Sequence, residues 1–223
     1  MRGDKIPKNI PKGIDWLQKA AIKGNPYAQE KIGECYAEGI GVPQDREEGN
    51  KWLLKTITNP GINSIIQLGF IYKLATRYES GKYVDKDLKK AFELYLQCTS
   101  ETLPFSFPMA YNKIGEYYEK GIFVEKNYEM AVRYFKKAIE KGECTGLPEY
   151  KLSLFYSKGL GVEKNLIKAR ELLKLSSDQG CLEAKIALHP IVYPFINNLT
   201  IFLRIFKKNL SEPVLGHRRK GIS

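Results

Sequence analysis

The chain has 223 residues, 43% of them apolar, and its 14 tyrosines and 10 phenylalanines can fill a core, which excludes wholesale disorder. Its formal net charge of +11 favours acidic partners, such as an acidic protein surface, nucleic acid or anionic lipid, without choosing among them. The 4 cysteines form no CxxC pair and there are only 2 histidines, so the sequence predicts no zinc site.

The N-terminal segment MRGDKIPKNIPKG lacks the apolar stretch of a secretory signal. The sequence contains no run of about twenty apolar residues, so we predict no membrane-spanning helix. By default we therefore expect a cytoplasmic protein with reduced, buried cysteines. Residues 3–16 match the second half of the repeat described next, so we expect one helix near 9–24 and a chain that is a piece of a longer array.

From residue 27 the sequence repeats with a period of about 40 residues, which is typical of a stacked array rather than one globule. Each copy has a tyrosine near the end of a helical pattern, then a glycine, then an Asp or Asn six residues after that glycine. The recurring positions are Gly33, Tyr36, Gly39 and Asp45; Tyr78, Gly81 and Asp87; Gly115, Tyr118, Gly121 and Asn127; and Tyr156, Gly159 and Asn165.

Each recurring position has a physical role. The glycine after the tyrosine suits the end of a helix, where it adopts the left-handed conformation without steric cost. The Asp or Asn is expected to cap the next helix, and Asp45 with Glu48 has the spacing of a capping box. Gly33 and Gly49 are expected to face each other and let the paired helices approach closely. Every copy has a glycine or alanine at the position of Gly49. A bulky core residue is expected three positions after it, at Trp16, Trp52, Leu94, Tyr134 and Leu172.

The pattern predicts helical hairpins over about 27–59, 63–98, 109–141 and 147–179. The second of them contains two tyrosine registers that differ by six residues, so we expect an insertion that lengthens its first helix. Two copies also depart at the second glycine of the G-x-G-V turn, where Tyr83 and Phe123 stand instead.

Units of the form A-x3-[IL]-G-x2-Y-x2-G-x-G-V-x2-[DN]-x3-A-x2-[WY], such as IGECYAEGIGVPQD and LFYSKGLGVEKN, resemble the Sel-one-like repeat (SLR) family, which is related to tetratricopeptide repeats. The resemblance covers about residues 3 to 189. It implies an all-α, right-handed α-solenoid of stacked antiparallel helical hairpins, an alpha-alpha superhelix. Residues 1–189 would hold an N-terminal half-unit to about residue 24, four full hairpins and a short C-terminal half-unit. It also implies a non-enzymatic scaffold or adaptor that binds a peptide or partner protein in the concave groove of the array.

The C-terminal segment departs from the repeat. We expect an amphipathic helix over 190–210, followed by a basic flexible tail over 211–223. Its apolar face would carry Phe195, Leu199, Phe202, Phe206 and Leu210, opposite Arg204, Lys207 and Lys208. Two roles fit this pattern: a capping helix that covers the last hairpin, or an interfacial helix that holds the chain on a membrane surface through 195–210. The second role makes the protein a membrane-associated adaptor.

The sequence predicts no enzyme, because no motif places a nucleophile, a general base or a metal ligand, and it predicts no cofactor. His189 is expected to be structural. One recurring position is a candidate for partner binding: the residue five before each motif tyrosine is lysine, at Lys31, Lys73, Lys113 and Lys151. These lysines either cover apolar surface with their stems or form a row of cations for an acidic segment. Nucleic acid is disfavoured, because the basic residues are spread around the helices, and the sequence leaves the oligomeric state open.

Overall fold

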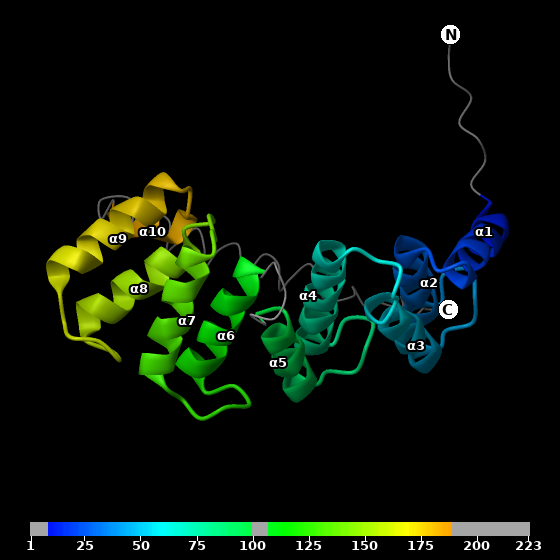
Figure 1. The fold of residues 1–223 in the computed structure, drawn as a ribbon, viewed down its shortest axis with the longest axis horizontal. Coiled ribbons are helices and arrows are strands. Elements are labelled where there is room, and N and C mark those ends of the chain that lie inside the picture. Colours follow the sequence, from blue (N-terminus) through cyan, green and yellow to red (C-terminus); the bar gives the residue numbers. More distant parts are fainter. Residues whose placement is uncertain (1–8, 100–106, 189–223) are drawn as a thin grey trace, which may run out of the picture.

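The structure is a computed structural model that describes residues 9–99 and 107–188, and this part of the chain is built from helices and connections without a strand (Figure 1). The helices are α1 (Ile10–Ile22), α2 (Pro26–Glu38), α3 (Arg46–Ile57), α4 (Ser64–Ser80), α5 (Leu88–Gln97), α6 (Pro108–Lys120), α7 (Tyr128–Glu140), α8 (Leu147–Lys158), α9 (Leu166–Asp178) and α10 (Leu182–Leu188). They pair as hairpins α2–α3, α4–α5, α6–α7 and α8–α9, which are stacked between α1 at one end and α10 at the other (Figure 1). The predicted all-α solenoid of hairpins is thus confirmed.

The second helix of every hairpin begins at the expected Asp or Asn. The side chains of Asp45, Asp87, Asn127 and Asn165 each accept a hydrogen bond of 2.9 Å from the backbone N–H three residues later. The backbone N–H of each cap donates to the carbonyl of the preceding motif tyrosine, at 2.8 to 3.0 Å. The cap residue therefore joins the two helices of a hairpin: its side chain bonds the second helix, and its backbone N–H bonds the first. The reciprocal bond of a capping box is absent at Asp45, whose N–H is bonded to the Tyr36 carbonyl and not to the Glu48 side chain.

The first helix of each hairpin ends in a left-handed glycine. Gly39, Gly81, Gly121 and Gly159 have φ angles of 73°, 75°, 68° and 71°. Two residues later the chain is left-handed again, both at Gly41 (φ 71°) and at Tyr83 (φ 70°). Tyrosine therefore adopts the conformation of the glycine that it replaces, at a cost in strain. A side chain at Gly41 has no such room, because its Cβ would lie 2.5 Å from the Ile10 side chain.

Close approach explains the small residues inside the helices. A Cβ on Gly33 would lie 2.9 Å from the Gly49 carbonyl oxygen, and a Cβ on Gly49 would lie 2.7 Å from the Gly33 carbonyl oxygen. The two backbones are thus in contact, as the sequence pattern predicts. In the third hairpin the same position has a different neighbour, since Gly115 makes room for the ring of Phe135.

The irregular second hairpin has the predicted long first helix. Helix α4 has 17 residues, whereas α2 and α6 have 13 each and α8 has 12. The insertion is thus absorbed as about one extra helical turn and not as a loop.

The core lies between the helices, in clusters that run along the array. The largest cluster joins Leu53 of α3 to α4, α5 and Tyr117 of α6, so it crosses from one hairpin to the next. The prediction that Trp16 lies in the core is wrong. Its side chain is 64% exposed, because no described element packs against the outer side of α1. The predicted helix over 190–210, the tail 211–223 and His189 lie outside the described residues.

Candidate functional site

Ion pairs join the first helices of the hairpins, α2, α4, α6 and α8, one to the next, and we call the surface that these four helices form the first-helix face. The four recurring lysines lie on it, one on each helix. Each has a glutamate within ion-pair distance, and the pairs are Lys31–Glu34 (2.9 Å), Lys73–Glu30 (3.3 Å), Lys113–Glu79 (3.1 Å) and Lys151–Glu119 (2.9 Å). The structure therefore places the lysines in a row, but a row of ion pairs rather than of free cations.

Three of these pairs join neighbouring hairpins. Lys113 and Lys151 each reach the glutamate that directly follows the motif tyrosine of the preceding copy. The first copy has Ala37 at that position, and Lys73 bonds to Glu30 instead. The Tyr-Glu dipeptides at 78–79 and 118–119 are the sequence signal for this pairing, which becomes visible only when one copy is compared with the next.

The lysines differ in how much of the side chain remains available. Lys31 and Lys73 are 59% and 55% exposed, whereas Lys113 and Lys151 are 27% and 18% exposed. The hydrogen bond that Lys31 donates to Glu34, followed by the charge of that carboxylate, raises the pKa of Lys31. A partner could therefore meet the first two lysines with little rearrangement, while the other two are largely occupied within the array.

Arg77 was not identified from the sequence, and its side chain is more enclosed than that of any of the four recurring lysines. Its side chain is 12% exposed, and Nη2 lies 2.8 Å from Glu30 Oε1 and 2.6 Å from Glu34 Oε1. The guanidinium carbon also lies 5.3 Å from the centre of the Tyr83 ring. Arg77 thus holds α4 to α2 and packs against Tyr83, the residue with a left-handed backbone in the turn after α4.

A hollow of about 570 Å³ lies on the first-helix face around this cluster. Its lining comes from α2, α4 and α6 and from the turn after α4, and includes Glu30, Arg77, Tyr83 and Lys113. Both signs of charge are present with one aromatic ring. Such a surface suits a polar protein segment better than an apolar ligand.

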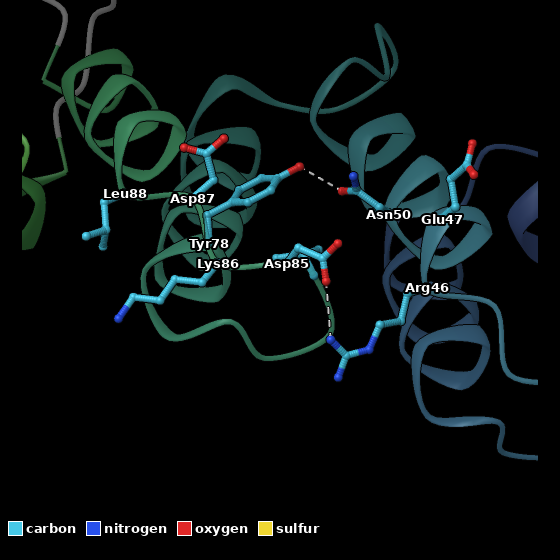
Figure 2. Close-up of a pocket in the computed structure, with 9 residues that line it drawn as sticks. Arg46, Glu47, Asn50, Tyr78, Asp85, Lys86, Asp87 and Leu88 are labelled. Atoms are coloured by element: carbon cyan, nitrogen blue, oxygen red, sulfur yellow. Dashed lines mark hydrogen bonds and ion pairs between the residues drawn. The ribbon is translucent and has the colours of Figure 1, made fainter.

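A larger hollow of about 760 Å³ lies away from this face, between α3 and the connection from α4 to α5 (Figure 2). The Tyr78 hydroxyl donates to Asn50 Oδ1 at 2.8 Å, and Arg46 Nη1 lies 3.4 Å from Asp85 Oδ1 (Figure 2). Both interactions join neighbouring hairpins. Because they are made within the array, we assign this hollow to the packing of the repeats.

The described residues offer little for chemistry. No three His, Cys, Asp or Glu side chains among them converge to hold a metal ion. Cys35, Cys98 and Cys181 are buried and Cys144 is exposed, and all four are free thiols. Burial raises the pKa of Cys98 to about 12, which keeps this thiol protonated. None of the helices in the described part of the chain is long and apolar enough to cross a membrane.

Comparison with known proteins gives a consistent result. The family model described as Sel1 repeat matches residues 1–25, 26–59, 70–97, 108–143 and 149–181, which together make up more than half of the chain. The third match begins inside α4, where the inserted turn interrupts the pattern.

Two similar solved structures share the fold. The first is c5321, a protective antigen present in uropathogenic Escherichia coli strains displaying an SLR fold; it is 26% identical, with 88% of this chain and 39% of that chain covered and a TM-score of 0.64. The second is a Sel1 repeat protein from Oxalobacter formigenes. It is 26% identical, with 86% of this chain and 52% of that chain covered and a TM-score of 0.63. The chain thus spans about half or less of the length of these proteins. With five matched segments and the same stacked hairpins, the chain belongs to the Sel1 repeat family.

Proposed function

We propose that this protein is a non-enzymatic scaffold that binds a peptide or a partner protein along the first-helix face. Sel1 repeat proteins bind protein partners, and the repeat is a non-catalytic scaffold fold. The observation that carries the proposal for this chain is the mixed-charge hollow of about 570 Å³, because it is formed by three successive first helices and is open to an extended segment.

An acidic segment is the partner that the charge favours. The chain carries +11 overall, and Lys31 and Lys73 present more than half of their side-chain surface to solvent. Partner carboxylates would compete with Glu34 and Glu30 for these two lysines. Each exposed pair contributes only about 0–1 kcal/mol, so binding must use several lysines together and should weaken as salt rises.

The test replaces Lys31, Lys73, Lys113 and Lys151 together with glutamine, after capturing partners and identifying them by mass spectrometry. The matched control replaces four exposed lysines elsewhere, Lys51, Lys89, Lys136 and Lys164, which changes the net charge equally. We expect the first variant alone to lose affinity for the captured partner, most strongly at low salt. If its melting temperature falls while its affinity is unchanged, the lysines serve only to join the hairpins.

The C-terminal segment is the second part of the proposal, and the end of the array favours capping over membrane binding. Leu166, Ile167 and Leu182 are exposed on α9 and α10. Elsewhere the start of a second helix meets the connection of the next hairpin, as Arg46 meets Asp85. Residues 190–210, with five apolar positions at helical spacing, directly follow α10 in the sequence, and we propose that they cover these exposed side chains.

Liposome co-sedimentation and a truncation separate capping from membrane attachment. The full chain should stay in the supernatant with anionic vesicles, and deletion of 190–223 should lower the melting temperature and increase the binding of a hydrophobic dye. Sedimentation of the full chain with vesicles, together with an unchanged melting temperature of the deletion, would favour the membrane-associated adaptor.

A further inference from the structure

A smaller hollow of about 360 Å³ has a charge opposite to that of the whole protein. It lies further along the first-helix face, where α4, α6 and α8 meet the start of α10. Three glutamates and one lysine contribute to its lining, namely Glu116, Glu143, Glu183 and Lys113. The hollow is therefore formally negative on a chain that carries +11.

Two of these carboxylates have no cationic partner among residues 9–99 and 107–188. No lysine or arginine of the described residues lies within ion-pair distance of Glu143 or Glu183, whereas Glu116 has Lys120 at 3.5 Å. Glu143 is only 8% exposed, and its Oε1 accepts a bond from the Thr145 N–H. Glu183 is exposed and accepts a bond from the Cys181 thiol. The hollow thus combines a shielded carboxylate with an accessible one.

A buried amide gives an independent sign of an unfilled site. Asn112 lines the hollow and is 7% exposed, yet its Oδ1 has no hydrogen-bond partner. Its Nδ2 lies 3.5 Å from Glu116 Oε1, which orients the amide with its oxygen away from that carboxylate. A buried carbonyl oxygen without a donor is unfavourable, so a group that brings N–H donors into the hollow would be stabilised.

The remaining lining suits the stem of a long side chain. Met109, Leu147 and the ring of Tyr72 supply apolar surface beside the carboxylates. Burial, followed by the charges of Glu79, Glu143 and Glu116, raises the pKa of Tyr72 to about 12. The hydroxyl therefore stays neutral, and the field at this point is one that favours a cation.

We propose that this hollow accepts the side chain of one lysine or arginine from the bound partner segment. The ammonium or guanidinium group would meet Glu143, Glu183 and the Asn112 oxygen, and the methylene groups would lie against Met109 and Leu147. This inference rests on the proposed scaffold function and makes it more specific. The partner would carry a basic residue at one fixed position, in a segment whose other charged residues are acidic.

The experiment is phage display of random heptapeptides against the full chain. The overall charge of the protein predicts enrichment of Asp and Glu, so a shared Lys or Arg position among the selected peptides would point to this hollow. We expect such a position, and we expect its replacement by norleucine in a synthetic peptide to weaken binding about tenfold.

Variants locate the effect. Glu143→Gln and Glu183→Gln should each weaken binding of the selected peptide, while Glu163→Gln, which removes an exposed charge from another loop, should not. Glutamine at 143 can still accept from Thr145, and the Glu183 variant is on the surface, so at least one protein will fold. Selected peptides that share no basic residue, or that bind both variants as tightly as the wild type, would overturn the inference and leave the scaffold function standing. Enrichment of no peptide at all would contradict the scaffold function itself.

Discussion

At the scale of single residues, the repeat is held by the Asp or Asn that caps each second helix. Replacing Asp87 with alanine should lower the free energy of unfolding by about 0.5–2 kcal/mol, because the Lys90 N–H loses its acceptor. Chemical denaturation measures this change, and the same loss is expected at Asp45, Asn127 and Asn165. Asp85 is the comparison, since it lies in the same connection with its side chain 95% exposed and makes only a surface ion pair to Arg46, whose loss should cost less than about 1 kcal/mol. Equal effects of the alanine changes at 85 and 87 would contradict the capping role.

Glycine in the turns has two separate functions that a pair of substitutions can distinguish. Gly142 and Gly161 both have positive φ, at 88° and 63°. A Cβ at Gly142 would meet nothing within 4 Å, whereas at Gly161 it would overlap the backbone of Tyr128 and Glu129. Alanine at 142 should therefore cost only the conformational strain of about 1–2 kcal/mol. Alanine at 161 should cost clearly more, and equal melting temperatures for the two variants would contradict the close packing at Gly161.

At the scale of helices, ion pairs between first helices set how one hairpin sits on the next. Arg77→Gln removes the cation that Glu30 and Glu34 share, while each keeps one half-exposed lysine, so we expect a loss of about 1.5–3 kcal/mol in the free energy of unfolding. Lys73→Gln removes a half-exposed pair to the same Glu30 and should cost less than about 1 kcal/mol. Thermal denaturation of both variants tests the order, and a larger loss for Lys73→Gln would show that Arg77 does not anchor α4.

Helix boundaries could be predicted from the sequence because they depend on local chemistry. The caps at Asp45 and its counterparts, the glycine ends and the long α4 each follow from a few neighbouring residues. The partners and the burial of single side chains could not be predicted, because they depend on contacts between different copies of the repeat. Arg77 meets glutamates more than forty positions away, and the Asn112 Oδ1 has no hydrogen-bond partner in a hollow that residues of α4, α8 and α10 also line. The exposure of Trp16 depends likewise on what stands next to α1.

At the scale of the whole molecule, the two surfaces of the array differ in the side chains that they carry. The connections between hairpins pack against neighbouring second helices, as at Arg46 and Asp85, and so hold the stack together. The first-helix face instead carries the mixed-charge hollow and, further along, the acidic one. A partner segment lying across both hollows would contact α2, α4, α6 and α8 together, which gives a repeat protein affinity without a single deep pocket.

Site-specific photo-crosslinking tests this central claim most directly. A photoreactive residue would be placed at Thr76 or Met109, which line the two hollows of the first-helix face, and at Lys89 or Lys136 on second helices as controls. Binding along the first-helix face predicts that the captured partner, identified by mass spectrometry, is crosslinked from positions 76 and 109 and not from 89 and 136. Crosslinks of that partner confined to positions 89 and 136 would contradict it.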